Sequence, residues 1–223
     1  MKSELGRLGS SLFLTEEEET GLVVPTGLCY SESLAEGFIV VGRLISSKSF
    51  HREALHTTLR STFNSVRGME FKLTEGERFL LKFFHVLDRD RVLTCCPRAY
   101  EKNLLVLVPV EVTDDPKLID LDWCDFHIYI HGLVLGKMNQ DVASFIGSRL
   151  GKFKDVGRDN NGDIWGSSVR TRASIDITKP LKRALKLRTV LGDEQFVTFT
   201  YEKLPYFCYL CGCLGYLGGQ CKM

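Results

Sequence analysis

The sequence has little net charge and no long apolar run, and both absences restrict what the protein can be. Its 29 basic and 28 acidic side chains leave a formal net charge of +1, so the whole molecule is not an electrostatic binder of nucleic acid. No run of about 18 apolar residues occurs, and no transmembrane helix is expected. The N-terminus lacks a charged-then-apolar signal segment, so we expect an intracellular protein, in the nucleus or the cytoplasm.

Motifs of catalysis are also missing. The sequence has no phosphate-binding loop, dinucleotide fingerprint or serine elbow. Cys124, Asp125 and His127 are close in sequence, but neighbours on a strand point to opposite faces and no glycine-rich oxyanion turn adjoins them. We therefore expect no enzymatic activity and no small-molecule substrate.

Cysteine, in contrast, is abundant, with eight residues in the chain. In a reducing compartment, clustered cysteines more often indicate a metal site than disulfides. Cys208, Cys211 and Cys221 have the spacing Cys-x2-Cys-x9-Cys, which is the frame of a zinc knuckle, Cys-x2-Cys-x4-His-x4-Cys. Tyr216 stands at the histidine position, and a phenol is a poor substitute because its pKa is near 10 and zinc prefers sulfur and nitrogen.

The sequence leaves three alternatives for the fourth zinc ligand of this knuckle. No histidine follows His131, so the segment has no imidazole of its own. Cys213 is a substitute that would complete four thiolates, although it lies only two residues from Cys211. The alternatives are a three-ligand site with water in the fourth position and a knuckle that has lost its metal. Zinc is the expected cofactor, with its binding weakened or lost.

Hydrophobic periodicity predicts an α+β protein that begins with a ferredoxin-like unit, the topology of RNA-recognition modules. The order βαββαβ is expected from strands at 38–45, 68–73, 78–85 and 103–110 and helices at 55–63 and 88–96. The second helix is expected to begin at a capping Asp88. A second, smaller α+β unit is expected from a helix at 138–150 and strands at 126–131, 152–158, 168–177, 186–191 and 196–201.

Composition and charge also predict a division of the chain into segments of different character. We expect an acidic, disordered lead-in at 1–36, a ferredoxin-like domain at 37–111, an acidic connector at 112–125, a second α+β unit at 126–203 and a degenerate CCHC knuckle at 204–223.

Positive charge is concentrated ahead of the knuckle. Residues 1–40 carry seven acidic and two basic side chains, whereas residues 168–188 carry seven basic side chains and one acidic one. Lys and Arg near a strand edge can neutralise phosphates, and the alternative is an ordinary solvated face. The basic side chains form what we call the basic strip: Arg170, Arg172, Lys179, Lys182, Arg183, Lys186 and Arg188.

Three aromatic residues flank the first knuckle cysteine: Tyr206, Phe207 and Tyr209. Aromatic side chains there can stack on unpaired bases, or they can pack against the preceding domain. Together with the strip they favour a protein that binds RNA or single-stranded DNA. The alternative from another class is a module for protein–protein interaction or self-assembly, and a further alternative is a non-functional truncated relic.

From about Gly37 to Cys221 the chain resembles a plant family of gag-like proteins derived from LINE-type retrotransposons, in which a domain of unknown function precedes a CCHC zinc knuckle. The resemblance is carried by these motifs: Val41-Gly-Arg-Leu, Phe83-Phe-His-x-Leu-Asp-Arg-Asp-Arg-Val, Leu104-Leu-Val-Leu, His131-Gly-Leu, Ile175-Asp-Ile-Thr-Lys-Pro-Leu-Lys-Arg and Tyr201-Glu-Lys-Leu-Pro-Tyr-Phe-Cys-Tyr-Leu-Cys-Gly.

This resemblance implies a nucleic-acid-binding protein that packages RNA and has no catalytic activity in this region. It implies zinc ligation by Cys208, Cys211 and Cys221, and it matches Tyr209 to the aromatic residue that grips an unpaired base. The sequence departs from the family at Tyr216, which replaces the ligand histidine, and at Arg98, which replaces a tryptophan.

Overall fold

The computed structural model describes residues 15–25, 37–47, 50–74, 77–159, 161–188, 192 and 194–221. The chain divides into two compact units, Met1–Glu36 and Gly37–Met223. The described residues of the first unit contain one short helix, α2 (Glu16–Thr20), inside the segment predicted to be disordered. The rest of that segment, 1–14 and 26–36, lies outside the described residues.

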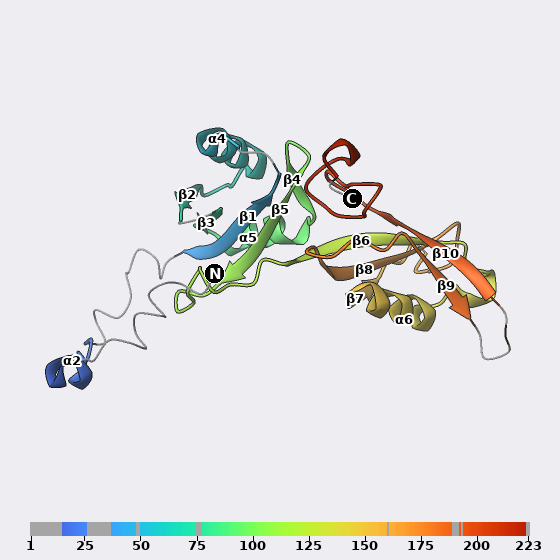
Figure 1. Cartoon of the computed structure of the whole chain (residues 1–223), viewed down its shortest axis with the longest axis horizontal. Coiled ribbons are helices and arrows are strands. Elements are labelled where there is room, and N and C mark those ends of the chain that lie inside the picture. Colours follow the sequence, from blue (N-terminus) through green and yellow to red (C-terminus); the bar gives the residue numbers. More distant parts are fainter. Residues whose placement is uncertain are drawn as a thin grey trace. The chain divides into compact units, whose positions relative to one another are not determined.

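The second unit contains two five-stranded antiparallel sheets and, in its described part, three α-helices (Figure 1). The first sheet has the order β2-β3-β1-β5-β4. Its strands are β1 (Phe38–Ile45), β2 (Met69–Leu73), β3 (Arg78–Phe83), β4 (Arg98–Tyr100) and β5 (Asn103–Val110). The α+β class expected from the sequence is confirmed.

Both faces of the first sheet are buried. Helices α4 (Arg52–Phe63) and α5 (Val86–Thr94) contribute to an apolar cluster on one face, which includes Val40 of β1 and Leu105 of β5. The alternate residues Val41 and Leu104 belong to a second, larger cluster. Burial on both faces explains why β1 and β5 read as nearly continuous apolar runs.

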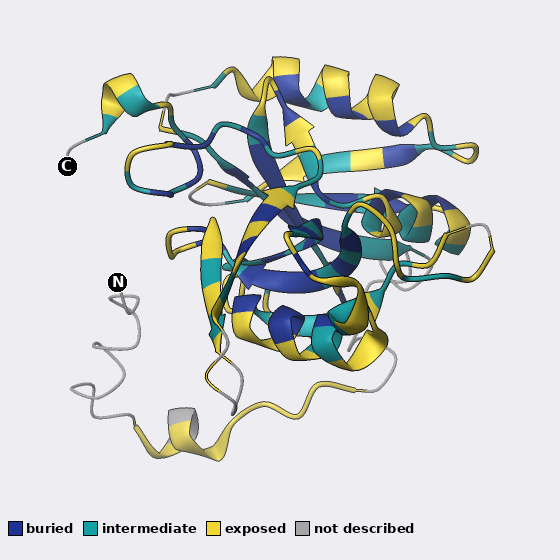
Figure 2. Ribbon diagram, turned by 90° about the vertical axis from the view of Figure 1, so that its right-hand side faces the viewer, coloured by how far each residue is buried: buried dark blue, intermediate teal, exposed yellow. Residues whose placement is uncertain are grey.

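The second sheet has the order β7-β8-β6-β10-β9. Along β6 (Trp123–His131) buried and half-buried residues alternate, as the sequence predicted. Helix α6 (Gln140–Leu150) packs against β7 and β8 and presents Ala143 and Ile146 to the larger cluster. The other strands are β7 (Lys152–Val156), β8 (Val169–Asp176), β9 (Ala184–Arg188) and β10 (Glu194–Tyr201). In Figure 2 the helices α4, α5 and α6 each show buried and exposed residues.

The larger apolar cluster contains residues of both sheets, among them Val41, Leu104 and Phe126. The segment expected to be a connector is attached to the first sheet by two arginines. Arg43 donates to Asp122 Oδ1 at 2.8 Å, and Arg78 donates to the carbonyl oxygen of Ile119 at 2.8 Å. The two sheets therefore share one continuous core, while the division into domains stays a prediction.

Several element boundaries differ from the prediction. Helix α5 was expected to begin at a capping Asp88, and this is wrong: the N-cap is His85, whose Nδ1 accepts from Leu87 N at 3.2 Å. Asp88 is instead buried within the first turn of the helix. The short strand β4 was missed, because three residues carry too little periodicity to be recognised. Strand β9 begins earlier than predicted, and 189–191 lie outside the described residues.

None of the helices in the described segments combines the length and the apolar character that a membrane span requires.

Candidate metal centre and nucleic-acid interface

Three of the predicted metal ligands converge. The Sγ atoms of Cys208, Cys211 and Cys221 all lie within 4.8 Å of one another. Tetrahedral zinc–thiolate bonds of about 2.3 Å place neighbouring sulfurs about 3.8 Å apart. The cluster is therefore of a size that could hold a zinc ion after small side-chain adjustments, and its donors are of the type that zinc prefers.

A tight hairpin brings the first two cysteines together. Cys208 N donates to the carbonyl oxygen of Cys213 at 2.8 Å, and Gly212 N donates to the carbonyl oxygen of Cys208 at 2.8 Å. Gly212 has φ +82, a left-handed conformation that favours glycine. Chain geometry thus positions Cys208 and Cys211 on one turn, as expected for a Cys-x2-Cys pair.

The two candidates for the fourth ligand both interact with the side chain of Cys211. Tyr216 Oη is 3.1 Å from Cys211 Sγ, and this hydrogen bond lowers the pKa of Cys211 to about 6 and raises the pKa of Tyr216. Among the residues that the structure describes, the group of converging ligand atoms does not include Cys213. The position that a histidine would occupy in the knuckle frame is therefore taken by a phenol.

The knuckle is attached to the rest of the second unit by backbone hydrogen bonds. Ser47 N donates to the carbonyl oxygen of Gly215 at 3.2 Å, Leu181 N to that of Gly212 at 2.7 Å, and Tyr206 N to that of Lys102 at 2.6 Å. These bonds join it to the end of β1, to the segment after β8 and to the turn between β4 and β5. The cysteine cluster consequently belongs to the folded body.

The three predicted aromatic residues have different environments. Phe207 is 5% exposed and is part of the larger apolar cluster, so it packs in the core. Tyr209 is 74% exposed and makes an edge-on contact with Phe207, with ring centroids 5.2 Å apart. Tyr206 is half-buried. Of the three, Tyr209 has the ring surface that is most available to a ligand.

These aromatic residues line a pocket of about 570 Å³, which we call the knuckle pocket. Two lysines stand at its margin, one from the turn between β4 and β5 and one from the segment after β10. Both are exposed, and in the described part of the chain neither has an ion-pair partner. The lining residues are Ala99, Lys102, Lys203, Leu204, Pro205, Tyr206, Phe207, Tyr209 and Leu217.

Most of the basic strip is paired with carboxylates. Arg170 makes a two-point contact with Glu202, at 2.7 and 3.0 Å, and this bond lowers the pKa of Glu202 to about 2. The remaining pairs are Arg172 with Asp125 at 3.0 Å, Lys179 with Asp176 at 2.7 Å, and both Lys186 and Arg188 with Glu194.

Two members of the strip bind backbone oxygens instead. Lys182 Nζ donates to the carbonyl oxygen of Arg149, and Arg183 Nη1 donates to that of Tyr209 at 2.7 Å. A carbonyl oxygen does not cancel a full positive charge, so Lys182 and Arg183 remain cationic. The bond from Arg183 to Tyr209 links the basic strip to the knuckle. The use of the strip in nucleic-acid binding stays a prediction.

Sequence reasoning missed Lys102 and Lys203. Lys203 lies three residues before Tyr206, so its proximity to the aromatic group was visible in the sequence. Lys102 lies about a hundred positions earlier and reaches the pocket only because Tyr206 N binds its carbonyl oxygen. No sequence signal could have linked Lys102 to the knuckle.

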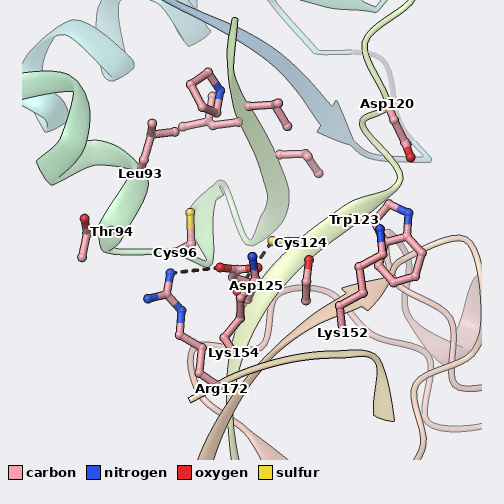
Figure 3. Close-up of a pocket in the computed structure, with 15 residues that line it drawn as sticks. Leu93, Thr94, Cys96, Asp120, Trp123, Cys124, Asp125, Lys152, Lys154 and Arg172 are labelled. Carbon is pink, nitrogen blue, oxygen red and sulfur yellow. Dashed lines mark hydrogen bonds and ion pairs between the residues drawn. The ribbon is translucent and has the colours of Figure 1, made fainter. Parts of the chain in front are cut away.

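A second cavity of about 520 Å³ lies between the two sheets (Figure 3). Two of its three cations have partners: Arg172 is paired with Asp125, and Lys152 Nζ lies 3.8 Å from the centroid of the Trp123 ring. The third, Lys154, shares the lining with the carboxylates of Asp120 and Asp125. Burial raises the pKa of the Cys96 thiol to about 11 and also raises that of Cys124, so neither thiol that lines the cavity is an activated nucleophile. The cavity is therefore a weaker candidate than the knuckle pocket.

Comparison with known proteins identifies the C-terminal region. A family model described as a zinc knuckle matches residues 175–223, a segment that includes the cysteine cluster and much of the basic strip. No curated protein matches the chain. The chain thus contains a zinc knuckle, a domain that indicates nucleic-acid binding in general.

Proposed function

We propose that the protein binds single-stranded RNA or DNA at the knuckle pocket. The observation that carries the proposal is the combination of an exposed tyrosine, Tyr209, with Lys102 and Lys203 around one pocket beside the cysteine cluster. Aromatic rings stack on unpaired bases at a gain of about 1–3 kcal/mol per base, and every base offers such a face. The site would accordingly select single strands with little sequence readout.

Electrostatics supports the same location. Lys102, Lys203, Lys182 and Arg183 have no carboxylate partner among the described residues, and Arg183 contacts the backbone of Tyr209. Their charge is therefore available to phosphates, whose neutralisation releases counterions. We propose that these four cations hold the sugar–phosphate backbone while Tyr209 contacts a base.

Zinc, where bound, would be held by Cys208, Cys211 and Cys221 and would supply folding energy to the hairpin that carries Tyr209. Contacts within the protein position the Tyr209 ring and the hairpin. Phe207 supports the Tyr209 ring from the core, and the bond between Leu181 N and the Gly212 carbonyl oxygen fixes the hairpin beside the cationic segment.

We also propose that the first sheet and its helices form a ferredoxin-like unit. The neighbours β2-β3-β1-β5 pair antiparallel, as that topology requires. In RNA-recognition modules the face opposite the helices contacts RNA. Here that face contributes the buried residues Val41, Leu104 and Val106 to the shared core, which favours binding at the knuckle over binding on the sheet.

The family resemblance extends the proposal to ancestry and role. We propose, from the sequence motifs alone, a plant LINE-type retroelement origin, an RNA-packaging role and no catalytic activity. The alternative function is self-association, which is favoured by the exposed side chains of Leu210 and Leu217 on the knuckle.

A titration of labelled oligonucleotides tests the proposal. Fluorescence anisotropy with a single-stranded RNA of about 12 nucleotides should show binding that weakens steeply between about 50 and 200 mM salt. The matching duplex should bind more weakly, since its bases are not free to stack. Absence of binding at low salt, or equal affinity for the duplex, would contradict the proposal. Sedimentation at high salt reports self-association, because apolar contacts do not weaken with salt.

A further inference from the structure

We infer that the cysteine cluster is a three-thiolate metal site with an open fourth position, which a neutral nitrogen-donor ligand from outside the chain can fill. In this arrangement Tyr216 is a hydrogen-bond donor to the Cys211 sulfur and does not bind the metal. The inference concerns the metal site alone and does not depend on nucleic-acid binding.

The position of Tyr216 supports the first part. Its Oη lies 3.1 Å from Cys211 Sγ, a hydrogen-bonding distance. The ground for excluding the phenol as a ligand is chemical, because its pKa is near 10 and zinc prefers sulfur and nitrogen donors. A metal-bound thiolate carries no proton, so the hydroxyl group of Tyr216 must be the donor in this pair.

Cys213 does not supply the missing ligand in this arrangement. Its carbonyl oxygen accepts from Cys208 N at 2.8 Å, which fixes its backbone in the hairpin. Among the described residues its sulfur is not one of the three that lie within 4.8 Å of one another, and its thiol interacts instead with the side chains of Cys211 and Tyr216 beside them. The three converging thiolates therefore form the ligand set that the fold presents.

The chemistry of the open position follows from charge and access. Three thiolates and one divalent zinc ion give a net charge of −1, which favours a neutral fourth ligand over an anionic one. Imidazole nitrogen suits zinc, and the chain has no histidine after His131 to provide it. Cys211, Tyr216 and Cys221 are only half-buried, so a small ring can approach from solvent.

The test uses the full-length protein loaded with Co²⁺, whose visible absorption reports the ligand set, and a titration with free imidazole. The wild-type spectrum should shift in a saturable manner as imidazole enters the fourth position. The Tyr216→His variant should already show the imidazole-bound spectrum and should not respond. A wild-type protein that takes up no Co²⁺, or whose spectrum is unchanged by imidazole, would overturn the inference.

Two further variants separate the competing ligands. Tyr216→Phe should keep the wild-type spectrum and its imidazole response, with Co²⁺ affinity about 10- to 100-fold lower because the hydrogen bond to Cys211 is lost. A changed spectrum in this variant would show that Tyr216 is a ligand. Cys213→Ser should behave as wild type, whereas a response gained only in Cys213→Ser would show that Cys213 holds the fourth position.

Discussion

The basic strip and the knuckle pocket both carry cations, but these cations differ in what they contact. Arg170, Arg172, Lys179, Lys186 and Arg188 are paired with carboxylates. The two lysines of the knuckle pocket, Lys102 and Lys203, have no such partner in the described part of the chain. A high density of positive charge in the sequence is therefore a poor measure of the charge that a polyanion can use, because carboxylates, some of them distant in sequence, neutralise it.

The largest effect expected from this difference is on affinity for single strands. The double variant Lys102→Ala/Lys203→Ala should lose two phosphate contacts and lower the slope of log affinity against log salt by about 1.4, which corresponds to about 25-fold weaker binding at 0.1 M salt. The charge-matched control Lys186→Ala/Arg188→Ala should change affinity much less. Anisotropy titrations at several salt concentrations measure both, and equal losses would remove the distinction between the two regions.

Removal of the exposed aromatic ring of the knuckle pocket should cause a smaller loss of affinity than removal of its two lysines. Tyr209→Ala should weaken binding of a single strand about tenfold through lost stacking, with a free energy of unfolding within about 0.5 kcal/mol of wild type, since the side chain is exposed. The control is Phe196→Ala, which removes an exposed aromatic ring from β10 directly opposite Lys186 in the sheet register. A greater loss of affinity in Phe196→Ala would place the binding surface on the second sheet.

The pocket exists only if the knuckle is attached to the first sheet, and Gly215 tests that contact. Its φ is +92, and a Cβ there would lie 3.2 Å from Ile45 Cγ2. Gly215→Ala should lower the free energy of unfolding by about 1 kcal/mol or more. Gly162→Ala is the matched control, because its φ of +86 imposes the same strain while no atom lies within 4 Å of the added Cβ. Urea denaturation should show the larger loss at Gly215.

The smallest expected effect is on protein stability, and it comes from the ion pair between Arg170 of the basic strip and Glu202. Arg170 lowers the pKa of Glu202 to about 2, below the ordinary value near 4.3. The stabilisation is therefore complete above about pH 4.3 and is lost as the pH falls towards 2; for a partly exposed pair it amounts to about 1 kcal/mol. Glu202→Gln should be less stable than wild type at pH 7, and the two proteins should converge near pH 2. A constant difference across this range would assign the effect to packing.

The secondary structure was largely predictable, and the reason is visible in particular elements. Strand β5 spans Asn103–Val110 as predicted, because eight apolar-rich residues between turn signals allow few alternatives. The start of α5 was wrong because a histidine ring, His85, provides the cap in place of Asp88. Cap identity depends on the local side-chain conformation, which periodicity does not encode.

The cysteine cluster of the candidate site was predictable from the sequence. The spacing of Cys208, Cys211 and Cys221 predicted a cluster that the fold brings within 4.8 Å. The partners of Arg170 and Arg172 were not predictable, since Glu202 follows β10 and Asp125 lies in β6, both far from them in the sequence. The same holds for Lys102, which joins the pocket through a backbone bond to Tyr206.

The sequence by itself determined the metal-binding frame, the tyrosine in place of its histidine and the α+β class, because these depend on spacing and periodicity along one chain. Only the tertiary structure decided which cations are paired with carboxylates, which aromatic ring is exposed and which face of the first sheet is buried. Those properties arise from contacts between segments that are distant in sequence, and ion pairing and burial are energies of such contacts.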